Sequence, residues 1–170
     1  MVIVAYFQQI ANRKPQNNKQ NMANWFECKV KYEKTLDTGV IKTVTEPYLV
    51  DALSFTEAEN RFIEQLKPYI SGEFSVTDIK RAKIAEMFDS EMDSDDRWYK
   101  AKVAFVTMDE KKGVEKRSYQ TMLVKAGTLR GALKNLEDGM KGTMSDWEVV
   151  SLADTPILDV FHYDYGAAKE

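Results

Sequence analysis

A pattern of apolar and polar residues that occurs twice constrains this chain more than any other feature of its sequence. The segment Trp25–Phe88 is followed by Trp98–Phe161, which repeats its order of strand-like and helix-like stretches. The first segment begins WFECKVKY and the second WYKAKVAF, and the second is one residue longer in the turn that follows. A turn is where a sheet tolerates an insertion. We therefore predict an internal duplication, with chance similarity between two β-rich segments as the alternative.

Each segment predicts the order β-β-α-β-β. Residues 25–32 alternate apolar and polar side chains, which is typical of a half-buried strand, and a turn leads to a second strand that ends at Ala52. Ser54 and Glu57 have the spacing of a capping box, which predicts a helix from Ser54 to about Lys67. Two short strands complete the unit, and the second segment follows the same plan.

The predicted fold class is therefore α+β: two tandem β-β-α-β-β repeats with mainly antiparallel sheets, one helix per repeat and a pseudo-twofold arrangement. Residues 1–21, the leader, differ in composition from the rest of the chain, because they contain no acidic residue and their second half is rich in Asn and Gln. We therefore expect the native protein to start at Met22. The linker DSEMDSDD contains five carboxylates and no base, which predicts a solvated segment. The predicted divisions are a disordered leader at 1–21, the first repeat at 22–88, an acidic linker at 89–96, the second repeat at 97–163 and a frayed tail at 164–170.

Charge and composition exclude several classes of protein. The chain contains 24 basic and 27 acidic residues, so it has no overall positive field for binding duplex nucleic acid. A single cysteine and a single histidine exclude an internal disulfide and a metal site built from Cys and His. No apolar run approaches the roughly 20 residues that span a bilayer. We expect a cytoplasmic protein with no membrane segment.

No pattern in the sequence predicts catalysis. Phosphate-binding, dinucleotide-binding and zinc-protease motifs are absent from the chain. Cys28 lies on the apolar face of the first predicted strand, where a small buried side chain is expected. His162 lies near the end of the second repeat without a partner motif. We therefore expect no catalytic residue, no cofactor and no metal site.

The outer face of the two opening strands is the strongest candidate for a binding surface. Tryptophan rings and lysines on one sheet face are typical of single-stranded nucleic acid binding, because rings stack on bases and ammonium groups contact phosphates. The alternative is that each tryptophan packs between the two copies while the lysines only solvate the strands. The basic residues after the third strand, which the second copy lacks, extend the candidate surface. The predicted partner-binding residues are Trp25, Lys29, Lys31, Lys80, Arg81, Lys83, Trp98, Lys100 and Lys102.

Several stretches of the chain resemble a family known only as a domain of unknown function, number four thousand four hundred and ninety-four. They are MANWFECKVKYEKT, TEPYLVDALSFTEAE, SGEFSVTDIKRAK and GALKNLEDGMKGTM. The resemblance extends from Met22 to about Tyr163 and implies an origin in gut-type anaerobic bacteria or their viruses. It implies no activity, ligand or catalytic residue.

These observations favour a non-enzymatic binding module for a protein or a single-stranded nucleic acid. A small-ligand-binding protein or an enzyme with a pocket between the repeats is the first alternative. The second is a viral or assembly accessory protein that acts as a homo-oligomer.

Overall fold

The computed structural model describes residues 24–163 of the chain. They form an α+β fold of two four-stranded sheets and two helices, as predicted. The expected leader, the expected start at Met22 and the tail lie outside the described residues. The elements in chain order are β1 (Asn24–Thr35), β2 (Ile41–Ala52), α2 (Phe55–Leu66), β3 (Phe74–Ala82), β4 (Glu86–Phe88), β5 (Arg97–Asp109), β6 (Val114–Ala126), α3 (Leu129–Gly139), β7 (Asp146–Asp154) and β8 (Val160–Phe161).

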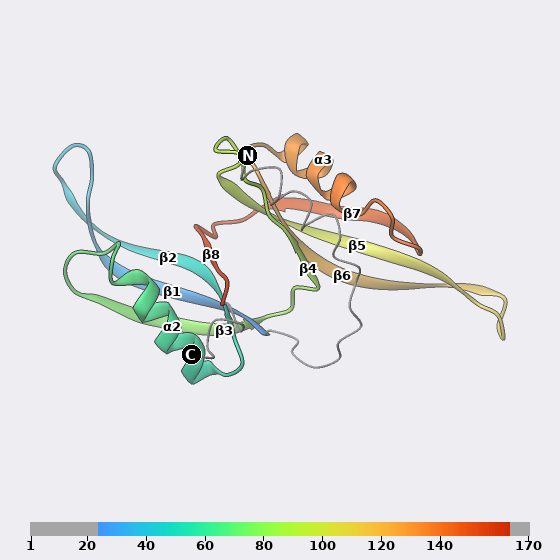
Figure 1. Cartoon of the computed structure of the whole chain (residues 1–170), viewed down its shortest axis with the longest axis horizontal. Helices are drawn as coiled ribbons and strands as arrows, with labels where there is room; N and C mark the ends of the chain where they lie inside the picture. Colours follow the sequence, from blue (N-terminus) through green and yellow to red (C-terminus); the bar gives the residue numbers. More distant parts are fainter. Residues whose placement is uncertain (1–23, 164–170) are drawn as a thin grey trace, which may run out of the picture.

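The two sheets have equivalent strand orders, with the strands of one long hairpin at the centre of each sheet. The first sheet has the order β3-β1-β2-β8 and the second β4-β6-β5-β7. The pairs β2–β8 and β4–β6 are parallel and the other pairs are antiparallel, so the prediction of mainly antiparallel sheets is confirmed. Each sheet packs against one helix, and the tips of the β1–β2 and β5–β6 hairpins point to opposite ends of the molecule (Figure 1).

The predicted alternation sets the two faces of the first sheet. Phe26, Cys28 and Val30 are fully buried on the face of β1 that packs against α2. The residues between them face the other way, as the pleat of a strand requires. Gly39 closes the β1–β2 hairpin with φ 79°, a left-handed conformation that glycine adopts without strain.

Both helices begin at the expected type of cap. Ser54 accepts a hydrogen bond from the backbone N–H of Glu57 at 3.2 Å, and the carboxylate of Glu57 accepts one from the N–H of Leu53 at 2.7 Å. The predicted capping box is therefore confirmed, and the helix ends at Leu66, one residue before the predicted end. No helix of the described residues is long and apolar enough to span a bilayer.

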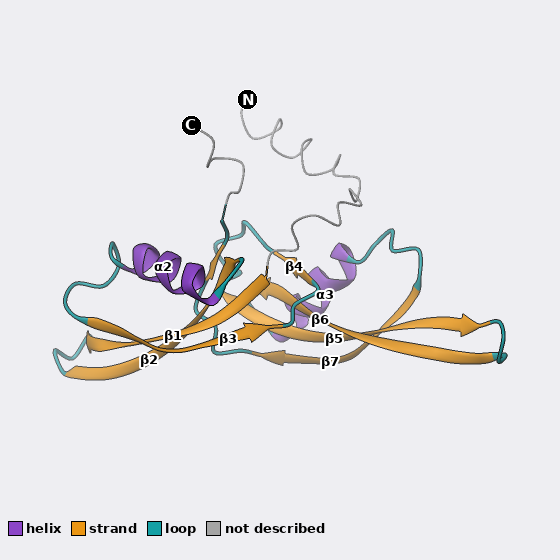
Figure 2. Ribbon diagram, turned by 90° about the horizontal axis from the view of Figure 1, so that it is seen from below, coloured by secondary structure: helices purple, strands orange, loops and turns teal. Residues whose placement is uncertain are grey.

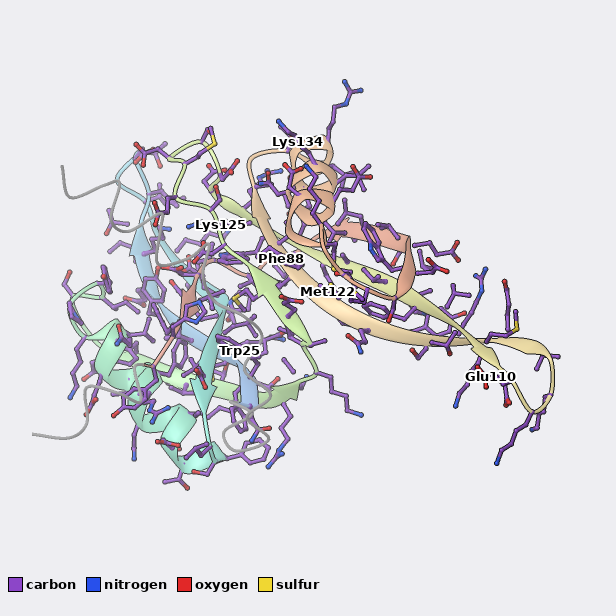
Figure 3. All side chains as sticks on the ribbon, turned by 45° about the vertical axis from the view of Figure 1, so that its right-hand side comes forward. Trp25, Phe88, Glu110, Met122, Lys125 and Lys134 are labelled. Carbon is purple, nitrogen blue, oxygen red and sulfur yellow. The ribbon has the colours of Figure 1, made fainter. Side chains whose placement is uncertain are left out.

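The last strand of each half belongs to the sheet of the other half. β8 extends the first sheet beside β2, and β4 extends the second sheet beside β6. Phe161 of β8 stacks on Tyr48 with ring centroids 5.3 Å apart, and Phe88 of β4 packs against the core beneath α3. Figure 3 shows Phe88 close to Met122 on neighbouring strands. Each half therefore contributes an aromatic side chain to the helix-covered core of the other.

A shared apolar core joins the two sheets. It contains residues of both halves. Its partly buried members include Trp25, and Trp98 is only 2% exposed. The buried members are Leu49, Trp98, Leu123, Ile157 and Val160, and the partly buried members are Trp25, Ala82, Ile84 and Met87.

The acidic linker is held on the second half by two of its carboxylates, which the prediction of a solvated segment missed. Asp89 pairs with Lys125 of β6 at 3.6 Å. Asp95 accepts hydrogen bonds from the backbone N–H of Gly127 at 3.0 Å and from the side-chain amide of Asn135 at 3.4 Å. A Cβ at Gly127 would overlap the carbonyl oxygen of Ser94, so glycine permits the close approach. Asp95 thus accepts a hydrogen bond from the backbone N–H that lies two residues before α3. Glu57 accepts the equivalent hydrogen bond, from the N–H of Leu53, before α2.

Replacing Asp95 with alanine is expected to lower the free energy of unfolding by about 1–3 kcal/mol, because the backbone N–H of Gly127 and the hydroxyl of Ser90 lose their acceptor. Urea denaturation followed by circular dichroism measures the change. Asp93→Ala, at an exposed position of the same linker, is the matched control and should stay within about 0.5 kcal/mol of the parent. Equal effects of the two substitutions would contradict a specific role for Asp95.

Candidate partner-binding face

Each sheet has one face that no helix of the described residues covers, which we call the open face. Figure 2 shows α2 above the first sheet, with the opposite side of that sheet bare toward the tip of its hairpin. Near the centre of the molecule, the open faces are closed by the shared core. Away from the centre they carry many polar and charged side chains.

The structure places five of the predicted lysines on the open faces. Lys29 and Lys31 lie on β1. Lys80 lies on the neighbouring strand β3, opposite Glu27 of β1. Lys100 and Lys102 occupy the equivalent face of β5. All except Lys29, which is half-buried, are exposed. The alternation in the sequence therefore predicted which of these lysines share a face of their strand.

Trp98 does not offer an exposed ring for base stacking. Its side chain is buried in the shared core, because a large aromatic surface is more stable against the apolar residues of both sheets than in water. Trp25 is half-buried in the same core, with the His162 ring edge-on at 5.1 Å. The packing alternative, in which the tryptophans join the two copies, describes their positions.

Arg81 and Lys83 do not join the other cations. Arg81 follows Lys80 on a strand and therefore lies on the opposite, helix-covered face. Its guanidinium lies 5.5 Å from the ring centroid of Phe55 and 5.7 Å from that of Phe26. Lys83 is exposed in the connection between β3 and β4. The third strand extends to Ala82, so Lys80 and Arg81 lie within it and not after it, and the predicted basic run is divided between three environments.

Acidic side chains accompany the cations of the open faces. Lys80 pairs with Asp78 at 3.0 Å, and Arg117 of β6 pairs with Glu148 of β7 at 2.5 Å. The hydrogen bond and the charge of Asp78 raise the pKa of Lys80. Lys102 lies 4.6 Å from the ring centroid of Tyr119, which is an exposed aromatic side chain. The surface is therefore mixed in charge.

A groove of about 690 Å³ hollows the far end of the first open face. It forms where the β1–β2 hairpin extends past Phe74, the first residue of β3. Ile41 in its wall is 64% exposed. Sequence analysis missed this groove, although the difference in length between the hairpin strands and β3 is its local signal. Its lining residues are Lys31, Tyr32, Glu33, Thr35, Ile41, Thr43, Ser71, Gly72, Glu73, Phe74 and Ser75.

A polar cluster beside the groove distinguishes the first half from the second. Tyr32 donates a hydrogen bond to Glu46 at 2.8 Å, and Tyr48 donates to the same carboxylate at 3.5 Å. Burial, together with the bond to Glu46, raises the pKa of Tyr32 to about 12, and burial is also the main cause that raises the pKa of Tyr48. The aligned second-half positions include Phe105 and Met122, which cannot donate such bonds. Both phenols remain protonated donors at neutral pH.

The remaining nucleophilic, titratable and metal-ligating side chains do not form a reactive site. Burial raises the pKa of the Cys28 thiol to about 12, so the group stays neutral and unreactive. A cavity of about 60 Å³ lies between α2 and β8, with Asp51, Arg61 and His162 in its lining. This volume is well below the roughly 300 Å³ of a typical small-ligand pocket. Within residues 24–163, no group of three or more His, Cys, Asp or Glu side chains is placed to hold a metal ion.

Fold and surface together define an α+β protein whose two helix-backed sheets each leave an open polar face. The chain belongs to the family described as a domain of unknown function (DUF4494), whose model matches residues 24–163. The resemblance found in the sequence is thereby confirmed. No curated protein and no solved structure matches the chain.

Proposed function

We propose that this protein is a non-enzymatic cytoplasmic binding module that holds a protein partner on the open face of its first sheet. The observation that carries the proposal is the groove at the far end of that face. It combines Lys31 and Glu33 with an exposed Ile41, so it offers charges of both signs around an apolar contact. Protein interfaces have this composition, with an apolar centre and a polar rim.

A protein partner accounts for the face better than a single-stranded nucleic acid does. A nucleic acid surface requires rings that stack on bases, but Trp98 is buried and Trp25 is half-buried in the shared core. It also requires cations that are not neutralised, whereas Asp78 pairs with Lys80. Phosphates would meet acidic side chains across much of the surface.

The interior of the molecule gives less support to an enzyme or small-ligand protein. Apolar side chains of the shared core occupy the junction between the sheets, where a pocket was the alternative expectation. The small cavity beside His162 has room for only a few water molecules. The single cysteine is buried and free, which suits a reducing compartment.

Replacing Ile41 with aspartate is expected to weaken binding of the native partner by roughly tenfold or more, because a buried charge would replace an apolar contact. The tagged protein is first used to capture partners from nuclease-treated and untreated lysate of the native cell. The captured protein is then purified and titrated against both forms of the module by calorimetry. Val114→Asp is the matched control, because Val114 is similarly exposed, at 52%, near the tip of the other hairpin.

Nuclease treatment should leave capture of the partner unchanged. Fluorescence anisotropy of labelled single-stranded oligonucleotides at low salt tests the other class directly. Tight oligonucleotide binding that depends on Lys29 and Lys31 would overturn the protein-binding proposal. So would a purified partner that binds the Ile41 variant as tightly as the parent.

A further inference from the structure

Within residues 24–163, the outer edge of β3 is a long strand edge that no other strand pairs with. β3 is the terminal strand of the first sheet, and no backbone hydrogen bond of the described residues reaches its outer side. Its nine residues, FSVTDIKRA, contain no proline. Such an edge presents a row of N–H and C=O groups that can pair with another strand.

The pairing of β3 with β1 determines which backbone groups point outward. Thr77 donates a side-chain hydrogen bond to the carbonyl oxygen of Lys29 at 3.4 Å, so the backbone of Lys29 faces β3. Lys29 lies opposite Asp78, and Asp78 and Lys80 therefore direct their backbone groups toward β1. Ile79, between them, directs its N–H and C=O away from the sheet. A second strand can hydrogen-bond to β3 at Ile79 and at alternate positions beyond it.

The charges of β3 are complementary to those of a second copy in one antiparallel register. A twofold axis at Ile79 places Asp78 of each copy opposite Lys80 of the other, and both pairs lie on the open face. Cross-strand pairs of opposite charge stabilise a sheet by roughly 0.2–1 kcal/mol each, whereas like charges destabilise it. Ile79 also provides the outward backbone groups that this axis requires. Backbone direction and side-chain charge therefore select the same register.

The neighbouring registers lack this agreement. An axis at Arg81, the next residue with outward backbone groups, places two guanidinium groups opposite each other. An axis at Asp78 or Lys80 places like charges together and also directs the hydrogen-bonding groups inward. The equivalent edge strand β7 has Ser151, Leu152 and Ala153 at the aligned positions, so it carries no comparable charge pattern.

We propose that β3 is a homodimerisation edge that pairs antiparallel with β3 of a second copy through a twofold axis at Ile79. The pairing joins two four-stranded sheets into one continuous sheet. The open faces of both copies then lie side by side, with Lys29 and Lys31 of each on the same surface. This inference stands on the edge of β3 and does not depend on the protein-binding groove.

Two single substitutions with opposite charge test the register. Asp78→Lys places two cations on the strand, and Lys80→Asp places two anions on it. Sedimentation equilibrium of the full chain should show a dimer for the parent and a dimer dissociation constant raised by roughly tenfold or more for each variant, because both cross-strand pairs become repulsive. An equimolar mixture of the two variants should recover the parental association, because each strand then complements the other.

Circular dichroism establishes that both variants are folded. The doubly substituted chain D78K/K80D, which restores self-complementarity, should also dimerise like the parent. Ala153→Asp on β7 is the matched control and should leave dimerisation unchanged. A parent protein that stays monomeric at all accessible concentrations would overturn the proposal, as would a mixture of the single variants that associates no better than either alone.

Discussion

Replacing Trp98 with alanine is expected to lower the free energy of unfolding by about 3–5 kcal/mol. The side chain is 2% exposed and packs in the core that both sheets share, beside Leu49 and Leu123. Its removal would leave a cavity at the junction that the surrounding strands cannot close. Because both sheets lose contacts, the protein should still unfold in one cooperative transition, at a lower denaturant concentration.

Urea denaturation of the parent and of the Trp98→Ala variant measures this loss. Trp25→Ala is the matched control at the equivalent position of the first half, where the ring is only half-buried and the loss should be smaller. A Trp98→Ala variant as stable as the parent would place the ring outside the core. In that case the Trp98 ring would be available to stack on a base.

Replacing Phe161 with alanine is expected to lower the free energy of unfolding by about 3 kcal/mol. Although Phe161 belongs to the last strand in the described chain, its ring stacks on Tyr48 and lies 6.3 Å from the ring centroid of Phe62 on α2. The truncation would therefore weaken the helix-covered core of the first half. Thermal and urea denaturation followed by circular dichroism measure the loss.

Leu158→Ala provides the control for Phe161→Ala, because Leu158 lies in the same segment but is 49% exposed. Its effect should be below about 1 kcal/mol. Similar losses for the two variants would mean that β8 is only loosely associated with the first sheet. A large loss at Phe161 alone supports its place in the core beside α2.

Local patterns in the sequence were sufficient to predict the elements of this fold. The alternation around Cys28 predicted which face of β1 is buried, and the spacing of Ser54 and Glu57 predicted the start of α2. Both signals are local, because a strand or a cap is specified by residues within a few positions of each other. The family resemblance added the extent of the domain but no chemistry.

The arrangement of these elements depends on contacts that the patterns do not specify. The apolar alternation predicts that Phe88 and Phe161 are buried. It does not predict which of the two sheets each of their strands joins. The same holds for Trp98, whose outward face is covered by the other sheet. In the linker, Asp93 and Asp95 are equivalent in sequence, and only the proximity of Gly127 and Asn135 distinguishes them.

The candidate surface was predicted in part. The period of two residues correctly placed Lys29 and Lys31 on one face, and the same rule applied to Lys80 and Arg81 would have separated them. The acidic partners were harder to anticipate, because Asp78 is close to Lys80 only once β3 has formed. The groove depends on how far the β1–β2 hairpin extends past the start of β3. That length can be predicted only when the pairing register of the strands is known.

The exchange of β4 and β8 has a consequence for how the protein is made. Leu49 pairs with Val160, which follows it by about 110 residues in the chain. During translation the first sheet must wait, without its fourth strand, until residue 161 has left the ribosome. Until then Tyr48 and Phe62 lack the ring that covers them, and the nascent chain exposes an apolar surface that chaperones and proteases recognise. The two halves are therefore completed together, once β8 has been synthesised.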